Sequence, residues 1–300
     1  MNYCFPKLLV SSIRRCAKER ECHGNLYLIN LKDCSFEKVA QLDSEINNAG
    51  RGGERGFRGI AIDRITSRTF IAKNSSIVVL DKKLKEIHEI FHKYFGAIHE
   101  VCIYNGILFV TSTAFNSILA FDINTYEYKF GICFKFENSF IFTQDIQISK
   151  YDANHLNNIC VNDAGIFVCG TGLGAIYCFK NNKMKKFAIV PFGTHNAQPY
   201  LAYTLYNDTV HNRIVMADVS GKVIKKADKT IVNRSSLVNY ENDRIAKQPF
   251  ARGLTYTKDL LIGGSSPDMI SVYDIKTFKL IKEINMSFDI SNTIHGIIVL

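Results

Sequence analysis

The residues best suited to chemistry in this chain are histidines and arginines that recur about every 40 to 60 residues. Each stands at, or just before, the start of an apolar run in which a strand is expected. Imidazole can act as a general base or bind a transition metal, and guanidinium can hold an anion through two parallel hydrogen bonds. The candidates are His99, His155, His195, His295, Arg58 and Arg252, together with Asn157 and Asn196.

One hypothesis is a divalent-metal site made by four of the histidines. Three or four imidazole ligands with an open position suit zinc, iron, copper or nickel, and the metal lowers the pKa of a bound water. None of these four histidines stands in an HExxH motif and no CxxC spacing is present, so only the expected fold brings the ligands together. The proposed metal ligands are His99, His155, His195 and His295.

A second hypothesis, compatible with the first, is a site for a small anionic molecule. Arg58 and Arg252 would hold a carboxylate, sulfate or phosphate. His99 or His155 would act as the general base. The other ligand-binding residues on this hypothesis are Asn157 and Asn196. The alternative to both hypotheses is structural, with these polar groups hydrogen-bonding neighbouring strand ends.

Several other kinds of site are disfavoured. No serine stands in a strand-to-helix elbow. Glu100 and Asp145 are the only acids near the expected site, whereas glycosidases need two placed carboxylates and calcium needs oxygen ligands. The net charge of +9 is spread over turns, as in Lys183–Lys186, so nucleic-acid binding is not expected.

A short recurring sequence phrase, in which one of these polar residues is followed by an apolar run, also predicts the fold. After most copies come three further short runs rich in Val, Ile, Phe and Tyr, separated by turns such as Asn105-Gly106. Four strands per unit make one propeller blade, so six copies predict an all-β, six-bladed propeller. The copies are Phe57–Asp63, Ile98–Ile103, Ala251–Tyr256 and Ile294–Leu300, with looser ones at His155–Val161 and Tyr200–Tyr206.

The two ends of the chain are expected to share one blade. The last copy leaves room for a single strand, and the N-terminal segment supplies three strands that lack an inner partner. Pairing the two segments closes the ring and removes open sheet edges. Residues 1–300 then form a single domain. The three N-terminal strands are Lys7–Val10, Asn25–Ile29 and Phe36–Ala40.

Seven blades is the alternative if the stretch Phe134–Asn154 hides a further hairpin. We expect a long connection there instead, with one extra strand at Phe142–Ser149. Inner strands line the central channel of a propeller, so residues at equivalent strand starts should converge at one mouth of that channel. This places the candidate residues together. The remaining histidines, expected at the surface, are His23, His88, His92 and His211.

Six short motifs follow one another in order: Ile98–Val101, Asn116–Leu119, His155–Asn158, Thr194–Pro199, Ala217–Gly221 and Ala251–Leu254. This order resembles a family of bacterial six-bladed propeller proteins of unknown function, which carry IHD, HLNG, H-x-PR, D-S-G and PRGL motifs. The resemblance spans roughly Arg58 to Ser266. It implies the fold and a candidate site, and it carries no reaction with it. This chain departs from the family pattern at Glu100, where Asp is usual, at Asn158, where Gly is usual, and at Gln198–Tyr200, which replaces a Pro-Arg pair.

Composition bounds the setting of the protein. Nine cysteines without a secretion signal predict free thiols and a cytoplasmic location. No apolar run approaches the roughly 18 residues of a membrane span, so no membrane partner is expected.

Two function classes remain. One is a small-molecule site at the channel mouth, such as a metal-assisted hydrolase or lyase acting on an anionic substrate. The other is a non-enzymatic propeller that offers a surface to ligands or protein partners. The fold does not decide between them, and whether the protein is an enzyme stays open. The set of histidines and arginines favours the first class.

Overall fold

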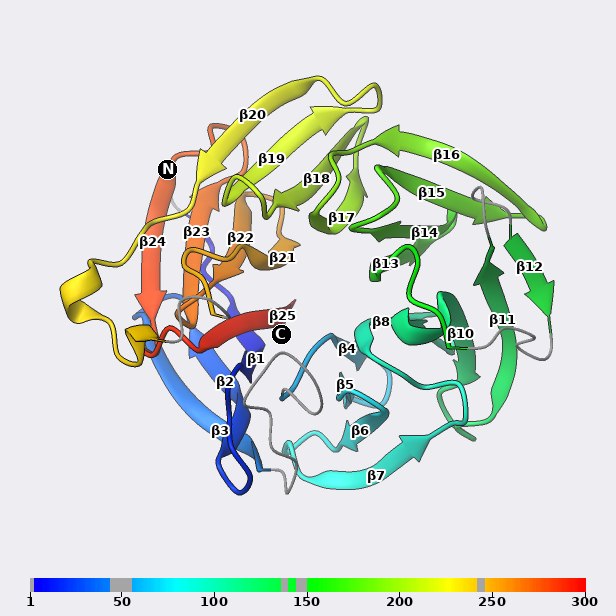
Figure 1. Ribbon diagram of the computed structural model, residues 1–300, viewed down its shortest axis with the longest axis horizontal. Helices are drawn as coiled ribbons and strands as arrows, with labels where there is room; N and C mark the ends of the chain where they lie inside the picture. Colours follow the sequence, from blue (N-terminus) through cyan, green and yellow to red (C-terminus); the bar gives the residue numbers. More distant parts are fainter. Residues whose placement is uncertain (1–2, 44–55, 136–139, 144–149, 242–245) are drawn as a thin grey trace. The chain divides into compact units, whose positions relative to one another are not determined.

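The computed structural model describes residues 3–43, 56–135, 140–143, 150–241 and 246–300. The protein is all-β, and its six sheets are the blades of a β-propeller (Figure 1). Five sheets have four strands and one has five. Helical residues in the described ranges are confined to short 3-10 turns such as η1 (Thr113–Phe115) and η3 (Arg234–Ser236). No helix among them has the length and apolarity that a membrane crossing requires.

The chain divides into two compact units, which are described separately. Unit 1 comprises Met1–Arg58, Asn207–Val215 and Lys225–Leu300. Unit 2 comprises Gly59–Tyr206 and Met216–Ile224.

Unit 1 contains the blade built from both ends of the chain. Its strands, in spatial order, are β25 (Asn292–Val299), β1 (Lys7–Arg14), β2 (Cys22–Asn30) and β3 (Ser35–Asp43). Figure 1 shows β25, in red, beside β1, in blue. The two strands are antiparallel, with Leu9 opposite Ile298. This confirms the predicted pairing of the N- and C-terminal segments, although β25 begins two residues before the predicted Ile294.

The second blade of unit 1 packs against the first through apolar side chains. Its strands are β21 (Arg252–Tyr256), β22 (Leu260–Ser265), β23 (Met269–Asp274) and β24 (Leu280–Asn285). Leu8 and Val10 of β1 share one buried cluster with Ile262 and Val272. Burial of such side chains contributes about 1.5–3 kcal/mol each, so the contact between the two blades is a main source of stability in unit 1.

Unit 2 contains three consecutive blades that share two apolar clusters. One cluster joins Phe70 and Val79 to Val110 and Leu119 in the next blade. The other joins the second blade to the third. The strands are β4 (Ile60–Asp63), β5 (Arg68–Ala72), β6 (Ser76–Leu80) and β7 (Glu86–Phe91); β8 (Ile98–Tyr104), β9 (Ile107–Ser112), β10 (Ser117–Asp122), β11 (Tyr128–Phe134) and β12 (Phe140–Thr143); and β13 (Leu156–Asn162), β14 (Gly165–Gly170), β15 (Ala175–Lys180) and β16 (Lys183–Ile189).

The extra strand of unit 2 lies earlier in the sequence than predicted. β12 pairs with β11, with Phe142 opposite Ile132, so the prediction of one more strand was right in kind. Its described bounds, Phe140–Thr143, replace the predicted Phe142–Ser149, and residues 144–149 lie outside the described ranges. Ring contacts of Phe140 and Phe142 with Phe179 of β15 explain why this apolar segment forms a strand there.

The sixth sheet corrects one prediction. Its strands are β17 (Thr194–Tyr200), β18 (Tyr203–Asp208), β19 (Arg213–Asp218) and β20 (Val223–Asp228). The looser copy of the phrase at Tyr200–Tyr206 was therefore misplaced, because it covers a turn and part of β18. β17 contains Pro199, and proline usually interrupts a strand. Proline is tolerated in an edge strand, and β17 is the edge of its sheet.

A β-bulge lies near each recurring phrase on β8, β13, β21 and β25. The register between neighbouring strands shifts between Ile98 and Val101, and again between Leu156 and Asn158. It shifts similarly between Arg252 and Leu254, and where β25 passes Val10 and Ser12 of β1. A bulge bends the strand and re-aims its side chains. The sequence signal for a strand start is thus also a signal for a bulge.

The cysteines are free thiols, as predicted. Burial raises the pKa of Cys102 to about 11 and those of Cys160 and Cys169 to about 12. Because the thiolate is the nucleophilic form, burial disfavours reactivity at these three cysteines.

Candidate functional site

His99 is held in one orientation at the start of β8. Its Nδ1 donates to the carbonyl of Ala97, at 2.8 Å, and also lies 3.0 Å from Thr113 Oγ1. The Thr113 hydroxyl donates to Leu156 O, so its oxygen accepts from the imidazole. With the proton on Nδ1, the neutral ring carries its basic lone pair on Nε2. His99 is therefore a buried ring whose tautomer is fixed by these two contacts.

His155 lies beside His99 and is anchored by a carboxylate. The two ring centroids are 4.8 Å apart, and the rings meet edge to face at 77°. Nδ1 of His155 is 2.7 Å from Asp152 Oδ2, and the side chain keeps 37% of its surface exposed. The structure thus brings together the two histidines predicted to do chemistry. Asp152 was missed, although its spacing three residues before a histidine is visible in the sequence.

His195 repeats the anchoring seen at His99. Its Nδ1 lies 3.2 Å from the carbonyl of Gly193, which is again two residues earlier in the chain. The next residue, Asn196, donates from Nδ2 to Glu100 Oε1 at 3.0 Å. This bond joins the start of β17 to the start of β8. Glu100 is therefore part of the cluster.

Two asparagines join β13 to β17. Asn157 donates from Nδ2 to Thr194 O at 2.9 Å, and Asn158 donates to Ala197 O at 2.6 Å. Asn157 Oδ1 is buried and accepts no hydrogen bond from the described residues. A buried acceptor without a donor is costly, so this oxygen is a place for a ligand or a water molecule to donate.

In unit 1, Arg252 and His295 form a pair. Arg252 Nη1 lies 3.0 Å from His295 Nε2. Guanidinium can only donate, so Nε2 must accept, and the imidazole is neutral with its proton on Nδ1. The Nε2 lone pair of His295 is therefore engaged by an arginine. The same arginine lies over the Phe250 ring, 5.0 Å from its centroid.

Arg58 is connected through Ser11 to β25, the strand that carries His295. The Ser11 hydroxyl donates to the carbonyl of Arg58, and Gly296 donates its N–H to Ser11 Oγ at 2.8 Å. The Arg58 side chain is buried, with 2% of the residue exposed. Arg58, Arg252 and His295 are thus linked within unit 1. Ser11 carried no sequence signal, because it is one serine within an ordinary strand.

The described residues contain no group of three or more His, Cys, Asp and Glu side chains placed to hold a metal ion. The predicted four-histidine set divides between the units, with His99, His155 and His195 in unit 2 and His295 in unit 1. Convergence of all candidates at one channel mouth therefore stays a prediction, and so does metal binding. Asp145, the second candidate acid, lies outside the described residues.

Unit 1 also buries two ionisable groups away from the candidate site. Burial lowers the pKa of Lys229 to about 7, and its Nζ lies 5.6 Å from the Tyr273 ring centroid. Burial raises the pKa of Asp268 to about 7, while Tyr27 donates to Asp268 Oδ2 at 3.2 Å. Lys229 Nζ and Asp268 Oδ1 have no hydrogen-bond partner among the described residues. Both groups are buried, so their ionisation makes stability depend on pH.

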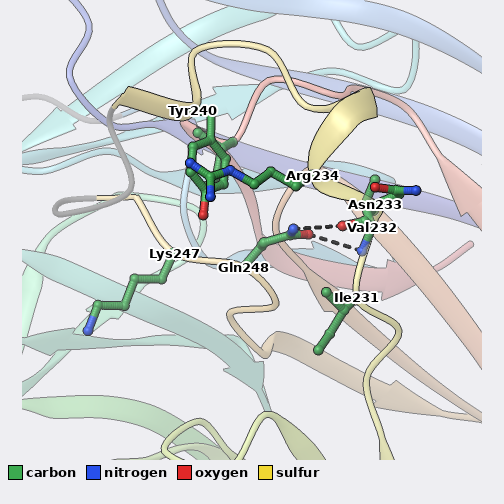
Figure 2. A pocket seen from close by; sticks show the side chains of 8 residues that line it. Ile231, Val232, Asn233, Arg234, Tyr240, Lys247 and Gln248 are labelled. Atoms are coloured by element: carbon green, nitrogen blue, oxygen red, sulfur yellow. Dashed lines mark hydrogen bonds between the residues drawn. The ribbon is translucent and has the colours of Figure 1, made fainter.

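Unit 1 has a pocket of about 530 Å³, lined mainly by residues of the segment between β20 and β21. Figure 2 shows two hydrogen bonds between the Gln248 side-chain amide and the main chain of Val232. Nε2 donates to Val232 O at 2.8 Å, and Oε1 accepts from Val232 N–H at 3.1 Å. Arg234 covers the Tyr240 ring at 3.9 Å from its centroid. None of the predicted site residues lines this pocket.

The prediction that the other four histidines lie at the surface was wrong for two of them. His23 is fully buried, with Nε2 3.0 Å from Lys18 O. His92 is half-buried and stacks on Tyr128, with ring centroids 4.8 Å apart. His88 and His211 are exposed, as predicted.

No protein-family model matches the chain, and no curated protein matches it. Solved structures do. A protein of unknown function from Bacteroides caccae has 13% identity and a TM-score of 0.61, with 98% of each chain covered. A chain of the nidogen/laminin complex has 9% identity and a TM-score of 0.64, with 97% of each chain covered.

A third similar structure is the WD40 β-propeller domain of Doa1. It has 10% identity and a TM-score of 0.54, and the match covers 99% of this chain and 87% of that one. At such low identities, the similarity concerns the fold and not the site, because function depends on particular residues grafted on a shared architecture. By structure, therefore, this chain is a six-bladed β-propeller that resembles, among others, a bacterial protein of unknown function.

Proposed function

We propose that unit 2 carries a site for a small anionic molecule, built on His99 and His155 with His195, Asn157 and Asn196. The observation that carries the proposal is the contact of two imidazole rings 4.8 Å apart, each anchored through Nδ1. An anchored Nδ1–H makes Nε2 the basic nitrogen of the neutral ring. Two anchored imidazole rings, His99 on β8 and His155 directly before β13, are thus in contact.

The chemistry of the pair favours an acidic ligand. A carboxylic acid or phosphate monoester that gives a proton to Nε2 creates an imidazolium next to its own negative charge, and such charge-assisted hydrogen bonds are the strong ones. Asn157 Oδ1, which lacks a donor among the described residues, would accept from a ligand hydroxyl. In a hydrolase or lyase reaction, His99 would be the general base, because it is the more buried and more tightly oriented ring.

A second candidate, divalent-metal binding, is favoured by the anchoring pattern. Metal-bound histidines usually donate their other ring N–H to a carboxylate or a main-chain carbonyl. His155 does so to Asp152, and His99 and His195 do so to carbonyls. These residues fit zinc, iron, copper or nickel as partial ligands. A bound metal would polarise the substrate or a water, and the described residues would leave several positions to those molecules.

The test is a thermal-shift and calorimetric screen of the protein against phosphate, sulfate, small carboxylates, Zn²⁺ and Ni²⁺. The informative variants are His99→Asn and His155→Asn. Asparagine can retain the donor at the Nδ1 position, so the anchor bond persists while Nε2 is lost. We expect both variants to weaken at least one ligand tenfold or more, with no comparable loss of stability.

His211→Asn is the matched control. Its Nδ1 is also anchored by an aspartate three residues earlier, Asp208, but the side chain is 61% exposed. If this variant weakens binding as much as His155→Asn does, the effect is not local to the site. If no anion or metal binds the unmodified protein, the histidines are structural and the non-enzymatic scaffold is the better description.

A further inference from the structure

The hairpin of β15 and β16 gathers lysines on one face of a blade in unit 2. Asn181 and Asn182 both have positive φ, at 51° and 55°, as a two-residue type I′ turn requires. This turn fixes the register, so that Lys180 lies directly opposite Lys183, and Cys178 opposite Lys185. Since side chains alternate between faces, Lys180, Lys183 and Lys185 project from the same face.

This arrangement is unfavourable unless something compensates for it. Like charges directly opposite each other on neighbouring strands are destabilising. Lys180 donates from Nζ to the Asp163 carbonyl, which carries no full charge. Lys183, Lys185 and Lys186 are exposed, and no ion pair involves them in the described part of the chain. The cluster therefore lacks a carboxylate partner of its own.

The lysines surround an open pocket of about 560 Å³. Ala164, Cys178 and Phe187 supply its apolar surface, and the four lysines supply positive charge. Phe187 is held by an edge-to-face contact with Phe167, with ring centroids 5.0 Å apart. Ammonium groups on flexible stems act as point charges, so they suit several separated negative charges better than one planar group.

The pocket lies along an edge strand. β16 is the last strand of its sheet, and near its C-terminal end Ile189 N–H donates to Val219 O at 3.0 Å. Between Lys183 and Ala188, its outer edge meets no further strand of the described chain. An extended peptide can add to such an edge through main-chain hydrogen bonds. Its alternate side chains would repeat with the two-residue spacing of Lys183 and Lys185.

We propose that β16 is a docking edge for an acidic, extended peptide segment of a partner protein. Acidic side chains two residues apart pair with Lys183 and Lys185, and the segment continues the sheet beyond β16. Lysines at an edge also discourage pairing with neutral strands, so the same residues select an acidic strand and reject others. This surface is separate from the histidine site and does not depend on it.

The experiment measures fluorescence anisotropy of a labelled peptide with alternating Thr and Glu, eight residues long. We expect Lys183→Glu combined with Lys185→Glu to weaken binding at least tenfold. The matched control, Lys82→Glu combined with Lys83→Glu, makes the same charge change at an exposed turn of unit 2 and should change binding less than twofold. A peptide of the same composition with Thr and Glu in separate blocks should bind at least fivefold more weakly.

Three results would overturn the proposal. One is no binding of the alternating peptide, and another is equal loss in both pairs of variants. The third is tighter binding of an eight-nucleotide oligothymidine with the same dependence on Lys183 and Lys185, which would assign the surface to nucleic acid. If the glutamate variant does not fold, Lys183→Gln combined with Lys185→Gln keeps the test decisive, because it removes the charges without reversing them.

Discussion

The two units use the same recurring phrase in different ways. In unit 2, His99 and His195 each donate from Nδ1 to the carbonyl two residues earlier, which leaves the basic lone pair on Nε2. In unit 1, the Nε2 lone pair of His295 accepts from Arg252. A histidine at the same place in a repeat thus donates to a main-chain carbonyl in one unit and accepts from an arginine in the other.

The residue that follows the histidine or arginine contributes to this difference. In unit 1 it is glycine after both Arg252 and His295, and a Cβ on Gly253 would lie 3.1 Å from His295 O. The strands approach closely there, so the polar side chains bond to each other. In unit 2 the residues that follow His99 and His195 are Glu100 and Asn196. These two side chains hydrogen-bond to each other, and the histidines take no part in that bond.

The largest expected effect concerns the sealed charges of unit 1. The pKa of Lys229 is about 7 in the folded protein and 10.5 when exposed, so the unfolded chain binds the extra proton between these values. Stability due to this group therefore rises as the pH increases from 7 to 10.5. Lys229→Met should stabilise the protein at pH 7 by about 3–5 kcal/mol, and by little above pH 10.5.

Urea unfolding at several pH values measures this effect, and Lys226→Met is the exposed control. Equal stability of Lys229→Met and the unmodified protein at pH 7 would contradict the buried-amine assignment. Asp268 gives the opposite slope: its raised pKa means that stability falls as the pH increases from about 4 to 7. Taking the difference between variant and parent isolates Lys229 from that slope.

The next effect separates the structural pair of unit 1 from the histidines of unit 2. Arg252→Met removes the donor to His295 Nε2 and should cost about 1–3 kcal/mol, because a buried acceptor is left unsatisfied. Combining it with His295→Leu should cost less than the sum of the single changes. Denaturant unfolding of all four proteins gives the coupling energy. Additive costs would show that the two side chains are independent.

A smaller effect is expected at the bond between Asn196 and Glu100. Asn196 has φ of 53°, a conformation that glycine adopts without strain. Asn196→Gly should therefore report mainly the lost hydrogen bond to the carboxylate, about 1–2 kcal/mol. Asn196→Ala should cost about 1 kcal/mol more, since alanine is strained at this φ. Equal melting temperatures for the two variants would assign the loss to the hydrogen bond alone.

The smallest effect is expected at His155. The side chain is partly exposed, and His155→Asn retains a donor for Asp152, so ligand-free stability should change by less than about 0.5 kcal/mol. Calorimetric melting checks this value. A loss above about 2 kcal/mol would place His155 with the structural histidine of unit 1 and remove the contrast between the units.

Much of the fold was predictable because its signals are local. Asn105-Gly106 marks a hairpin turn, and both residues have the positive φ that the turn needs. The lone copy of the phrase at His295 predicted the pairing of β25 with β1, which the register confirms. Such signals depend on a few neighbouring residues, and no distant contact changes their meaning.

The candidate site was only partly predictable, since its chemistry depends on distant partners. Nothing near His295 in the sequence shows that Arg252 would donate to it. His23 was misassigned because Gly24 resembled a turn residue. Instead, a Cβ on Gly24 would lie 2.2 Å from Ser12 O, so the glycine marks a close approach of two strands, and the neighbouring histidine is buried with it.

The bulges near the recurring phrase have a consequence for how such a protein can diverge. A residue within a bulge is set aside from the regular pairing of its strand, so its side chain can be exchanged while the neighbouring pairs keep their partners. His99 and Asn157 occupy such places on different blades. Substitutions at these few positions can thus introduce new ligand-binding groups while the strands keep their pairing. These positions are therefore the natural targets for redesigning the protein's specificity.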